Sequence, residues 1–308
     1  MDMIQILAKE LGIAAQQAES AVRLIDEGNT IPFIARYRKE VTGGLDDTVL
    51  RALDERLNYL RSLQKRREEV AALIESSGKL DEKQMRQMRE QLDKAQQLSE
   101  IEDLYRPYKQ KKRTRASIAK EKGLEPLAQM IWEQNCSEQQ LQSKVSEYVG
   151  EGKAETAQAA LDGAGDIIAE QISDSAEIRS DLRKYLQKNA VILTTKGTKE
   201  NEVYSMYYEY SESIQKIAPH RILAINRGEK EEALRVTLSA EPQSCFAMME
   251  RRVIRHNSPL TQRLSEICED SYKRLIFPSL ERELRAELTE KADAQAIGVF
   301  SENLKNLL

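Results

Sequence analysis

The chain has 308 residues, of which 40% are hydrophobic and 32% are charged. This length and apolar content suit one large domain or two ordinary ones, and they exclude a chain that is disordered by default. Only 5% of the residues are aromatic, and 13 glycines and 7 prolines are too few for the turns of a β-sandwich or β-barrel. The net charge of −4 excludes a polycation that coats nucleic acid with its whole surface, so any basic site must be local.

The cysteines and the hydropathy pattern indicate the compartment. Cys136, Cys245 and Cys268 lie far apart and form no CxxC pair, which is typical of a reducing compartment and argues against a disulfide framework. The opening sequence MDMIQILAKE lacks the basic and apolar regions of a secretion signal, and no stretch reaches the ~18 apolar residues of a membrane helix. We therefore predict a cytoplasmic protein without a membrane partner.

Three short helices are predicted at the N-terminal end. Apolar periodicity places them over residues 3–11, over residues 14–27 and from Pro32 onward, ending at glycines. We expect positive φ at Gly28 or in the Gly43–Gly44 pair. The third segment, PFIARYRKE, carries three apolar side chains among its cations. This pattern favours a core helix with cations at its rim or in ion pairs, and a basic interaction site is the alternative.

A long helical hairpin is expected next. Residues 46–77 contain neither glycine nor proline, and apolar residues, mainly leucine, recur at helical spacing. Gly78 ends this helix, and Asp81 can cap a returning helix that runs to about residue 100. At ~1.5 Å per residue the first helix is longer than a compact domain needs, which suggests an elongated scaffold.

The stretch from Arg106 to Lys120 is the one strongly basic part of the chain. It carries seven cations and lies between Asp103 and Glu121 without an intervening acid, with two tyrosines at its start. Such a segment can neutralise phosphates and stack a base. The alternative is a solvated loop, or one whose cations pair with acids of a neighbouring helix.

The rest of the chain is predicted to be mainly helical. Short helical segments cover residues 125–135, 138–149, 153–161, 164–173 and 175–186. Two β-branched stretches, residues 190–195 and 233–239, are expected to pair as a two-stranded element. A helix between them ends at Gly228, and the helical region after Pro242 is interrupted at Pro259 and Pro278.

These elements predict an all-α, elongated multi-helix scaffold with a long helical hairpin, a helix-turn-helix-like subdomain and a minor two-stranded β element. We expect a helical N-terminal domain over residues 1–188 and a helical central region with the β pair over residues 189–308.

Catalytic motifs are missing from the sequence. There is no GxxxxGK[ST], and Gly163-Ala-Gly165 lacks the third glycine of a dinucleotide fingerprint, so a helix start at Asp162 is the favoured interpretation. His220 and His256 have no Cys or His partner at metal-ligand spacing. We expect no enzyme activity, no cofactor and no metal.

Three long segments carry a family resemblance: GNTIPFIARYRKEVTGGLDD at residues 28–47, EDLYRPYKQKKRTRASIAKEKGLEPLA at residues 102–128 and HRILAINRGEKE at residues 220–231. In this order they closely resemble the Tex family of bacterial transcription accessory proteins. FSENLKNLL at residues 300–308 is similar to the family segment that leads into the next domain.

The resemblance implies a largely helical protein that acts in transcription and binds RNA or DNA. Family members add an RNase H-like domain, a helix-hairpin-helix domain and an OB-fold domain that supplies most nucleic-acid affinity. The resemblance therefore implies an N-terminal portion of such a protein, and no catalytic residue is transferred. The matched positions that we take as candidate nucleic-acid contacts are Arg106, Tyr108, Lys109, Lys111, Lys112, Arg113 and Arg115. Candidate secondary interaction residues are Arg36, Arg38, Lys39, Arg221, Asn226 and Arg227.

Two functions follow as hypotheses. The first is a non-catalytic scaffold of a transcription accessory factor, which binds RNA or DNA weakly and without sequence preference and contacts the transcription machinery. The second is a pure protein-docking module for RNA polymerase or ribosome-associated proteins, with the basic stretch as ordinary surface.

Overall fold

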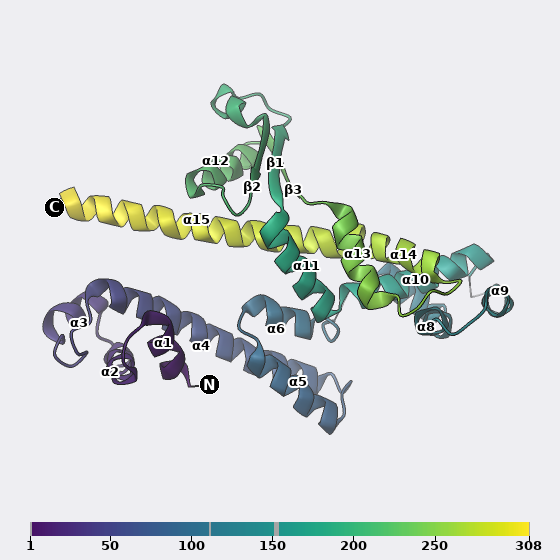
Figure 1. Ribbon diagram of the computed structural model, residues 1–308, viewed down its shortest axis with the longest axis horizontal. Helices are drawn as coiled ribbons and strands as arrows, with labels where there is room; N and C mark the ends of the chain where they lie inside the picture. Colours follow the sequence, from purple (N-terminus) through teal and green to yellow (C-terminus); the bar gives the residue numbers. More distant parts are fainter. Residues whose placement is uncertain (1, 111, 151–153, 308) are drawn as a thin grey trace. The chain divides into compact units, whose positions relative to one another are not determined.

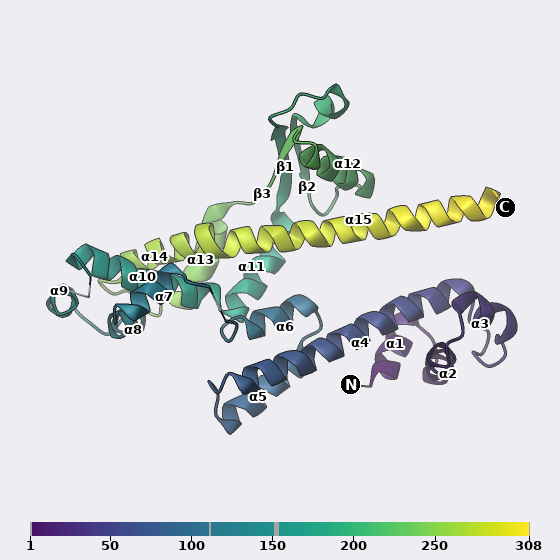
Figure 2. The same cartoon turned by 180° about the vertical axis from the view of Figure 1, so that it is seen from behind.

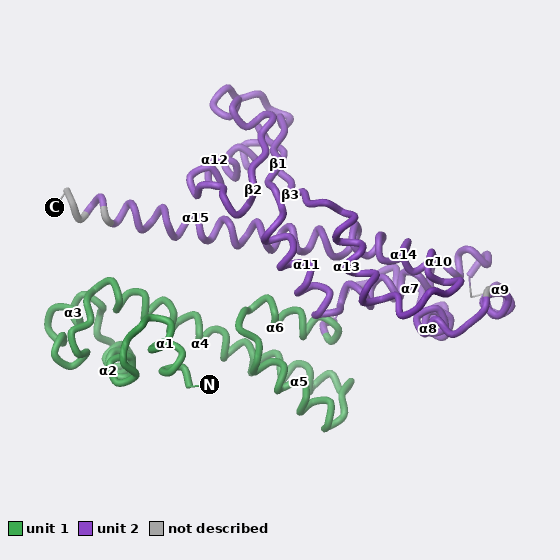
Figure 3. The backbone as a smooth tube through the Cα atoms, viewed as in Figure 1, with its two compact units in different colours: residues 1–108 green, residues 109–308 purple. Residues whose placement is uncertain are grey.

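The computed structural model describes residues 2–110, 112–150 and 154–307 (Figure 1). The chain forms two compact units, residues 1–108 and residues 109–308, and each is described by itself (Figure 3). The predicted domain boundary between residues 188 and 189 falls inside unit 2, and that finer division stays a prediction.

The secondary-structure elements in the described residues of unit 1 are all helices. Its elements are α1 (Met3–Leu11), α2 (Ala15–Asp26), α3 (Ile31–Tyr37), α4 (Asp47–Ser76), α5 (Glu82–Lys94) and α6 (Leu98–Tyr105). The predicted long helix and the returning helix of the hairpin are confirmed as α4 and α5.

Local signals set the helix ends of unit 1. Gly28 has φ of 86°, and Gly43 and Gly44 have φ of 63° and 91°, so the expected left-handed conformation is confirmed. At the start of α4, the Asp46 carboxylate accepts a hydrogen bond of 2.9 Å from the Val49 amide. Such caps satisfy amides that have no partner within the helix.

Helix α4 serves two hydrophobic clusters, which explains its length of 30 residues. Its first half buries Leu50, Leu53 and Leu57 against α1, α2 and α3. Its second half buries Val70 and Ile74 against α5 and α6. One continuous helix is therefore the backbone of the whole unit.

The returning helix is shorter than predicted. It ends at Lys94, Ala95 is extended, and α6 begins at Leu98. The interruption comes from side chains elsewhere: the Arg67 guanidinium donates to the Ala95 carbonyl, and the Glu100 carboxylate accepts from the Gln96 amide. Because no glycine or proline lies there, the local pattern contains no signal for this break.

Unit 2 combines helices with one small sheet. Its described elements are α7 (Arg115–Glu121), α8 (Glu125–Glu133), α9 (Glu138–Ser146), α10 (Ala157–Ser173), α11 (Ala176–Asn189), β1 (Val191–Lys196), the 3-10 helix η1 (Glu202–Tyr207), β2 (Glu209–Ser213), α12 (Pro219–Lys230), β3 (Leu234–Ser239), α13 (Pro242–Val253), α14 (Thr261–Asp270), the π-helix η2 (Ser271–Ile276) and α15 (Phe277–Leu307).

Helix α10 lies at the centre of one end of unit 2 and contacts α7, α8, α14 and η2. The predicted helix start at Asp162 is wrong, because α10 runs unbroken from Ala157 to Ser173. Gly163 allows close packing: a Cβ atom there would lie 2.5 Å from Leu124 Cδ1. A glycine in mid-helix here allows close contact with the neighbouring chain rather than a break.

The sheet has three antiparallel strands in the order β2-β1-β3. The predicted pairing of the two β-branched stretches is confirmed as β1 with β3, in the register Val191 to Ser239. The expectation of only two strands is wrong, since β2 pairs with the other edge of β1. Its sequence, EYSES, has no apolar alternation, so tertiary pairing rather than pattern makes it a strand.

Helix α12 packs beside the sheet and along α15 (Figure 2). It continues to Lys230, so Gly228 does not end it as predicted. A Cβ atom at Gly228 would lie 2.7 Å from Leu234 Cδ1, which shows that this glycine allows α12 to approach β3.

The two predicted proline interruptions have different outcomes. Pro259 lies between α13 and α14, as expected. At Pro278 the chain stays helical, because η2 precedes it and shifts the hydrogen bonding: the Phe277 amide donates to the Tyr272 carbonyl, five residues back. A π-helical turn lets a helix accommodate a proline that lacks an amide hydrogen.

Candidate nucleic-acid interface

The predicted basic stretch is divided between the two units and is partly helical. Arg106 and Tyr108 end unit 1, and the residues from Lys109 onward begin unit 2. Instead of one loop, the last part of the stretch forms α7. Lys111, one of the predicted contacts, lies outside the described residues.

Tyr108 serves packing in unit 1. Its ring lies partly buried against the cluster formed by α4, α5 and α6, and this burial raises the pKa of the Tyr108 phenol. Next to it, the Lys79 ammonium donates to the Pro107 carbonyl at 3.3 Å. Arg106 is half-buried. The Tyr108 ring is thus less available for base stacking than the sequence suggested.

In unit 2 the cations lie at the surface. Lys109, Lys112, Arg113 and Arg115 are all exposed. Arg113 Nη2 lies 3.7 Å from Glu121 Oε2, and both side chains are more than half exposed. Within the described part of the chain, Lys109 and Lys112 form no ion pair. Since exposed pairs contribute little, these cations stay available to a polyanion.

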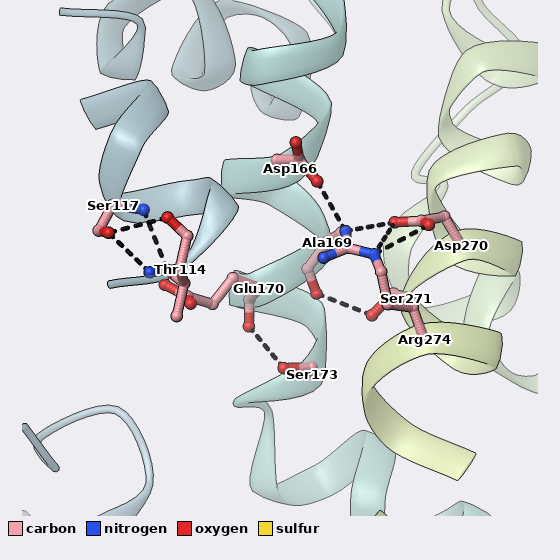
Figure 4. Close-up of polar contacts among 9 residues, drawn as sticks. All are labelled: Thr114, Ser117, Asp166, Ala169, Glu170, Ser173, Asp270, Ser271 and Arg274. Carbon is pink, nitrogen blue, oxygen red and sulfur yellow. Dashed lines mark hydrogen bonds and ion pairs between the residues drawn. The ribbon is translucent and has the colours of Figure 1, made fainter. Parts of the chain in front are cut away.

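Helix α7 fixes this basic segment to the core. The Thr114 hydroxyl accepts from the Ser117 amide at 3.0 Å, and the Ser117 hydroxyl accepts from the Thr114 amide at 2.8 Å (Figure 4). Ala116 and Ala119 are buried, and α7 packs against α10. The capping box and the two alanines therefore hold the adjoining cations at a defined place on unit 2.

An ion cluster lies on the other side of α10 (Figure 4). Arg274 Nη2 donates to Asp166 Oδ1 at 2.7 Å and also contacts Asp270. Desolvation raises the pKa of the Asp166 carboxyl above its ordinary value, although Arg274 opposes that rise. The Ser271 hydroxyl donates to the Ala169 carbonyl at 2.7 Å. These contacts join α10 to η2 and stabilise the helix on which α7 rests.

The secondary candidates on α3 are solvent-exposed. Arg36, Arg38 and Lys39 are exposed, and none forms an ion pair with another described residue. The prediction of core packing is wrong for two of the three apolar side chains: Tyr37 is 67% exposed and Phe33 is 37% exposed. In a helix of seven residues only one face can meet the core, and Ile31, Ile34 and Ala35 already occupy it. The helical spacing of these three residues could have predicted from the sequence that the two rings face outward.

The secondary candidates on α12 are mostly structural. Arg221 Nη1 lies 3.0 Å from Glu212 Oε2 and links α12 to β2. Asn226 Nδ2 donates to Thr289 Oγ1 at 2.8 Å and links α12 to α15. Arg227 is exposed. The structure does not place these residues in one site with Lys109–Arg115.

Other chemistry in the described residues is limited. The three cysteines are buried and form no disulfide, and burial raises the pKa of Cys268 to about 12. Within the described ranges, no three His, Cys, Asp or Glu side chains come together as a metal site. No described helix combines the length and the apolar character that crossing a membrane requires.

Comparison with known proteins places the chain in a family. The family model of the Tex-like protein N-terminal domain matches residues 1–75, and that of the Tex central region matches residues 137–300. Over 99% of its length, the chain is 46% identical to uncharacterized protein YdcI of Bacillus subtilis, of which it covers 42%. It is 39% identical to transcriptional accessory protein Tex of Neisseria gonorrhoeae, of which it covers 41%.

A human relative extends the comparison. The chain is 32% identical to human S1 RNA-binding domain-containing protein 1 and covers 32% of it. The chain thus spans less than half the length of each of these relatives. Because the matched N-terminal and central regions together span both units, this chain belongs to the Tex family.

Proposed function

We propose that this chain is a non-catalytic helical scaffold of a transcription accessory protein and that it associates weakly with RNA or DNA through its basic segment. Family membership supports the accessory role, and the names of two relatives refer to transcription and to RNA binding. The helix-turn-helix-like subdomain stays part of this proposal.

One observation carries the nucleic-acid part. Four exposed cations, Lys109, Lys112, Arg113 and Arg115, lie directly before and at the start of a helix that is anchored on the core of unit 2. The net charge of −4 is spread over the whole chain. Glu121, 3.7 Å from Arg113, offsets part of this local field, and acids more than a Debye length of about 8 Å away do not cancel it. Such a segment binds phosphates and does not distinguish one base from another.

Burial of the cysteines supports a role without catalysis. The raised pKa of Cys268 leaves its thiol protonated at neutral pH, and a protonated thiol is a poor nucleophile. A turnover assay on nucleotides and oligonucleotides, with and without divalent metal, tests this part. Cleavage that survives repurification and is lost with one carboxylate substitution would refute it.

The rival function is protein docking. It is favoured by two exposed apolar side chains on η1, Val203 at 76% and Met206 at 68% exposure, at a segment between two strands. A transcription or ribosome-associated partner would bind there whether or not the basic segment contacts nucleic acid.

A titration distinguishes the two functions. A labelled oligonucleotide is followed by fluorescence anisotropy at about 50 mM and about 200 mM salt. The variant combines Lys109→Gln, Lys112→Gln and Arg113→Gln. We expect affinity on the order of micromolar for the parent and weaker binding of every oligonucleotide by the variant. The salt slope should fall by about one for each phosphate that the variant no longer neutralises.

The matched control removes three other exposed cations of unit 2, with Lys184→Gln, Lys188→Gln and Lys216→Gln. It changes the net charge equally but leaves the segment intact. Equal weakening by both triple variants would mean that only overall charge matters. Equal binding by parent and segment variant would favour protein docking.

A further inference from the structure

A second basic surface, on α3 of unit 1, combines cations with open aromatic rings. We define this α3 surface as Phe33, Arg36, Tyr37, Arg38 and Lys39. The Phe33 and Tyr37 ring centroids are 5.3 Å apart and their planes are tilted by 45°. The Arg38 guanidinium lies over the Phe33 ring, 5.5 Å from its centroid. Arg38 therefore covers part of Phe33, and Tyr37 is the ring with the open face.

The rings face outward because of helix geometry. Ile34 is fully buried, and Ile31 and Ala35 pack against the same cluster, so this side of α3 is fixed to the core. Phe33 and Tyr37 are four residues apart and share the opposite side. Tyr37 keeps 67% of its surface exposed without any contribution to the cluster.

The chain after α3 is held in one conformation. Thr42 is fully buried, and its hydroxyl donates to the Lys39 carbonyl at 3.2 Å. Gln17 Nε2 donates to the Gly43 carbonyl at 2.8 Å. The Gly44 amide donates to the Lys39 carbonyl at 2.8 Å. The backbone that carries Arg38 and Lys39 is thereby preorganised, which lowers the entropic cost of binding.

The electrostatics of the α3 surface favour an anion. Between Asn29 and Gly44 the single acid is Glu40, against three cations. None of these cations has an ion-pair partner in the part of the chain that the structure describes. Unit 1 as a whole has more acidic than basic side chains, so the positive charge here is a local feature.

We infer that the α3 surface binds single-stranded nucleic acid, with a base stacked on Tyr37 and the flanking phosphates held by Arg36 and Lys39. A single strand presents unstacked planar bases and regularly spaced phosphates together, which matches an open ring between cations. In a duplex the base faces are stacked on one another, so only its phosphates can interact with the cations of the α3 surface. This inference rests on the nucleic-acid partner of the proposed function; it adds a second contact, in the other unit, and gives that contact a strand preference.

The test separates stacking from charge. The full chain is titrated by fluorescence anisotropy with labelled oligothymidylate of about twelve nucleotides, with an abasic strand of equal phosphate number and with a duplex of equal length. We expect Tyr37→Ala to weaken oligothymidylate binding about tenfold and to change abasic and duplex binding by less than about twofold. Tyr37→Phe keeps the ring and should stay within about twofold of the parent.

Matched controls come from α4 of the same unit. Leu73→Ala removes an exposed apolar side chain and Lys65→Gln removes an exposed charge, both away from the α3 surface. Arg36→Gln should weaken the binding of all three ligands. Lys65→Gln should weaken the binding of each ligand less than Arg36→Gln does. Because Tyr37 is largely exposed, its substitution leaves the core unchanged, and circular dichroism checks this.

Several outcomes would overturn the inference. They are equal binding of oligothymidylate by parent and Tyr37→Ala, or equal losses on abasic and normal strands. If the segment variant at Lys109, Lys112 and Arg113 loses binding but Tyr37→Ala does not, the proposed function stands and this inference fails. A parent that binds no strand at low salt contradicts both.

Discussion

Helices α4 and α10 are the central helices of their units, and they are packed in opposite ways. α4 buries leucines along its length, and each half covers a separate cluster. α10 buries mostly small residues and isoleucines, including Gly165 and Ala164, and is surrounded by several helices. The length of α4, 30 residues, lets its two halves contact separate clusters. Small side chains bring neighbours close, so that α7 and its cations are held tightly.

The largest expected effect is at a leucine of α4. Leu53 has no exposed surface, so Leu53→Ala leaves a cavity between α4 and the N-terminal helices. We expect the free energy of unfolding to fall by about 3 kcal/mol. Circular dichroism in urea measures the loss, and Leu73→Ala on the exposed side of α4 is the control. A similar loss from both would contradict the packing described for α4.

The next largest effect is expected in the ion cluster of Asp166, Asp270 and Arg274. Arg274→Gln leaves Asp166 and Asp270 without their shared partner, and we expect a loss of about 2 kcal/mol in unfolding free energy. Asp166→Asn should cost less, because Asp270 still pairs with Arg274. The chain's single tryptophan, Trp132, lies in unit 2, so its fluorescence in urea reports this unit. A larger loss from Asp166→Asn than from Arg274→Gln would contradict the role of Arg274 as the shared partner of both carboxylates.

The same carboxyl predicts a pH dependence. Desolvation raises the pKa of Asp166 in the folded protein above its ordinary value of 3.8. In the pH window just above that value, the folded state binds more protons than the unfolded state. Its contribution to stability therefore decreases as pH rises through the window. The unfolding free energy of the parent minus that of Asp166→Asn should therefore decrease from acid to neutral pH. An increase of this difference with pH would contradict the raised pKa.

Two glycines of α10 lie in different packing environments, one tight and one ordinary. A Cβ atom at Gly163 would lie 2.5 Å from Leu124, whereas one at Gly165 would lie 3.5 Å from Ile267. We expect Gly163→Ala to destabilise unit 2 by about 1 kcal/mol. Gly165→Ala should be neutral or stabilising by up to about 1 kcal/mol, because alanine favours a helix. Trp132 fluorescence in urea measures both, and equal effects would contradict the close contact at Gly163.

An effect of similar size is expected at a helix end of unit 1. Gly28 has φ of 86°, and a Cβ atom added there would meet no other atom within 4 Å, so only the backbone conformation opposes alanine. Gly28→Ala should cost roughly 1 kcal/mol. Thermal melts followed by circular dichroism check this, and a melt identical to that of the parent would refute the left-handed helix end.

Sequence by itself determined what depends on neighbours along the chain. The glycines after α1 and α2, the Asp46 cap and the leucine spacing of α4 act within a few residues, so their patterns predicted the elements correctly. The family resemblance rests on contiguous segments and is confirmed by the matches. The cations of both basic regions were also evident, because charge is a property of single residues.

Tertiary structure decided the features that depend on distant partners. The break after α5 involves the contact of Arg67 with the Ala95 carbonyl, the close approach of Leu124 explains the glycine at position 163 of α10, and β2 needs the free edge of β1. Exposure of Tyr37 followed from which side of α3 the core uses. A segment's own composition does not encode its neighbours, and burial, breaks and strand pairing are set by those neighbours through packing and hydrogen bonding.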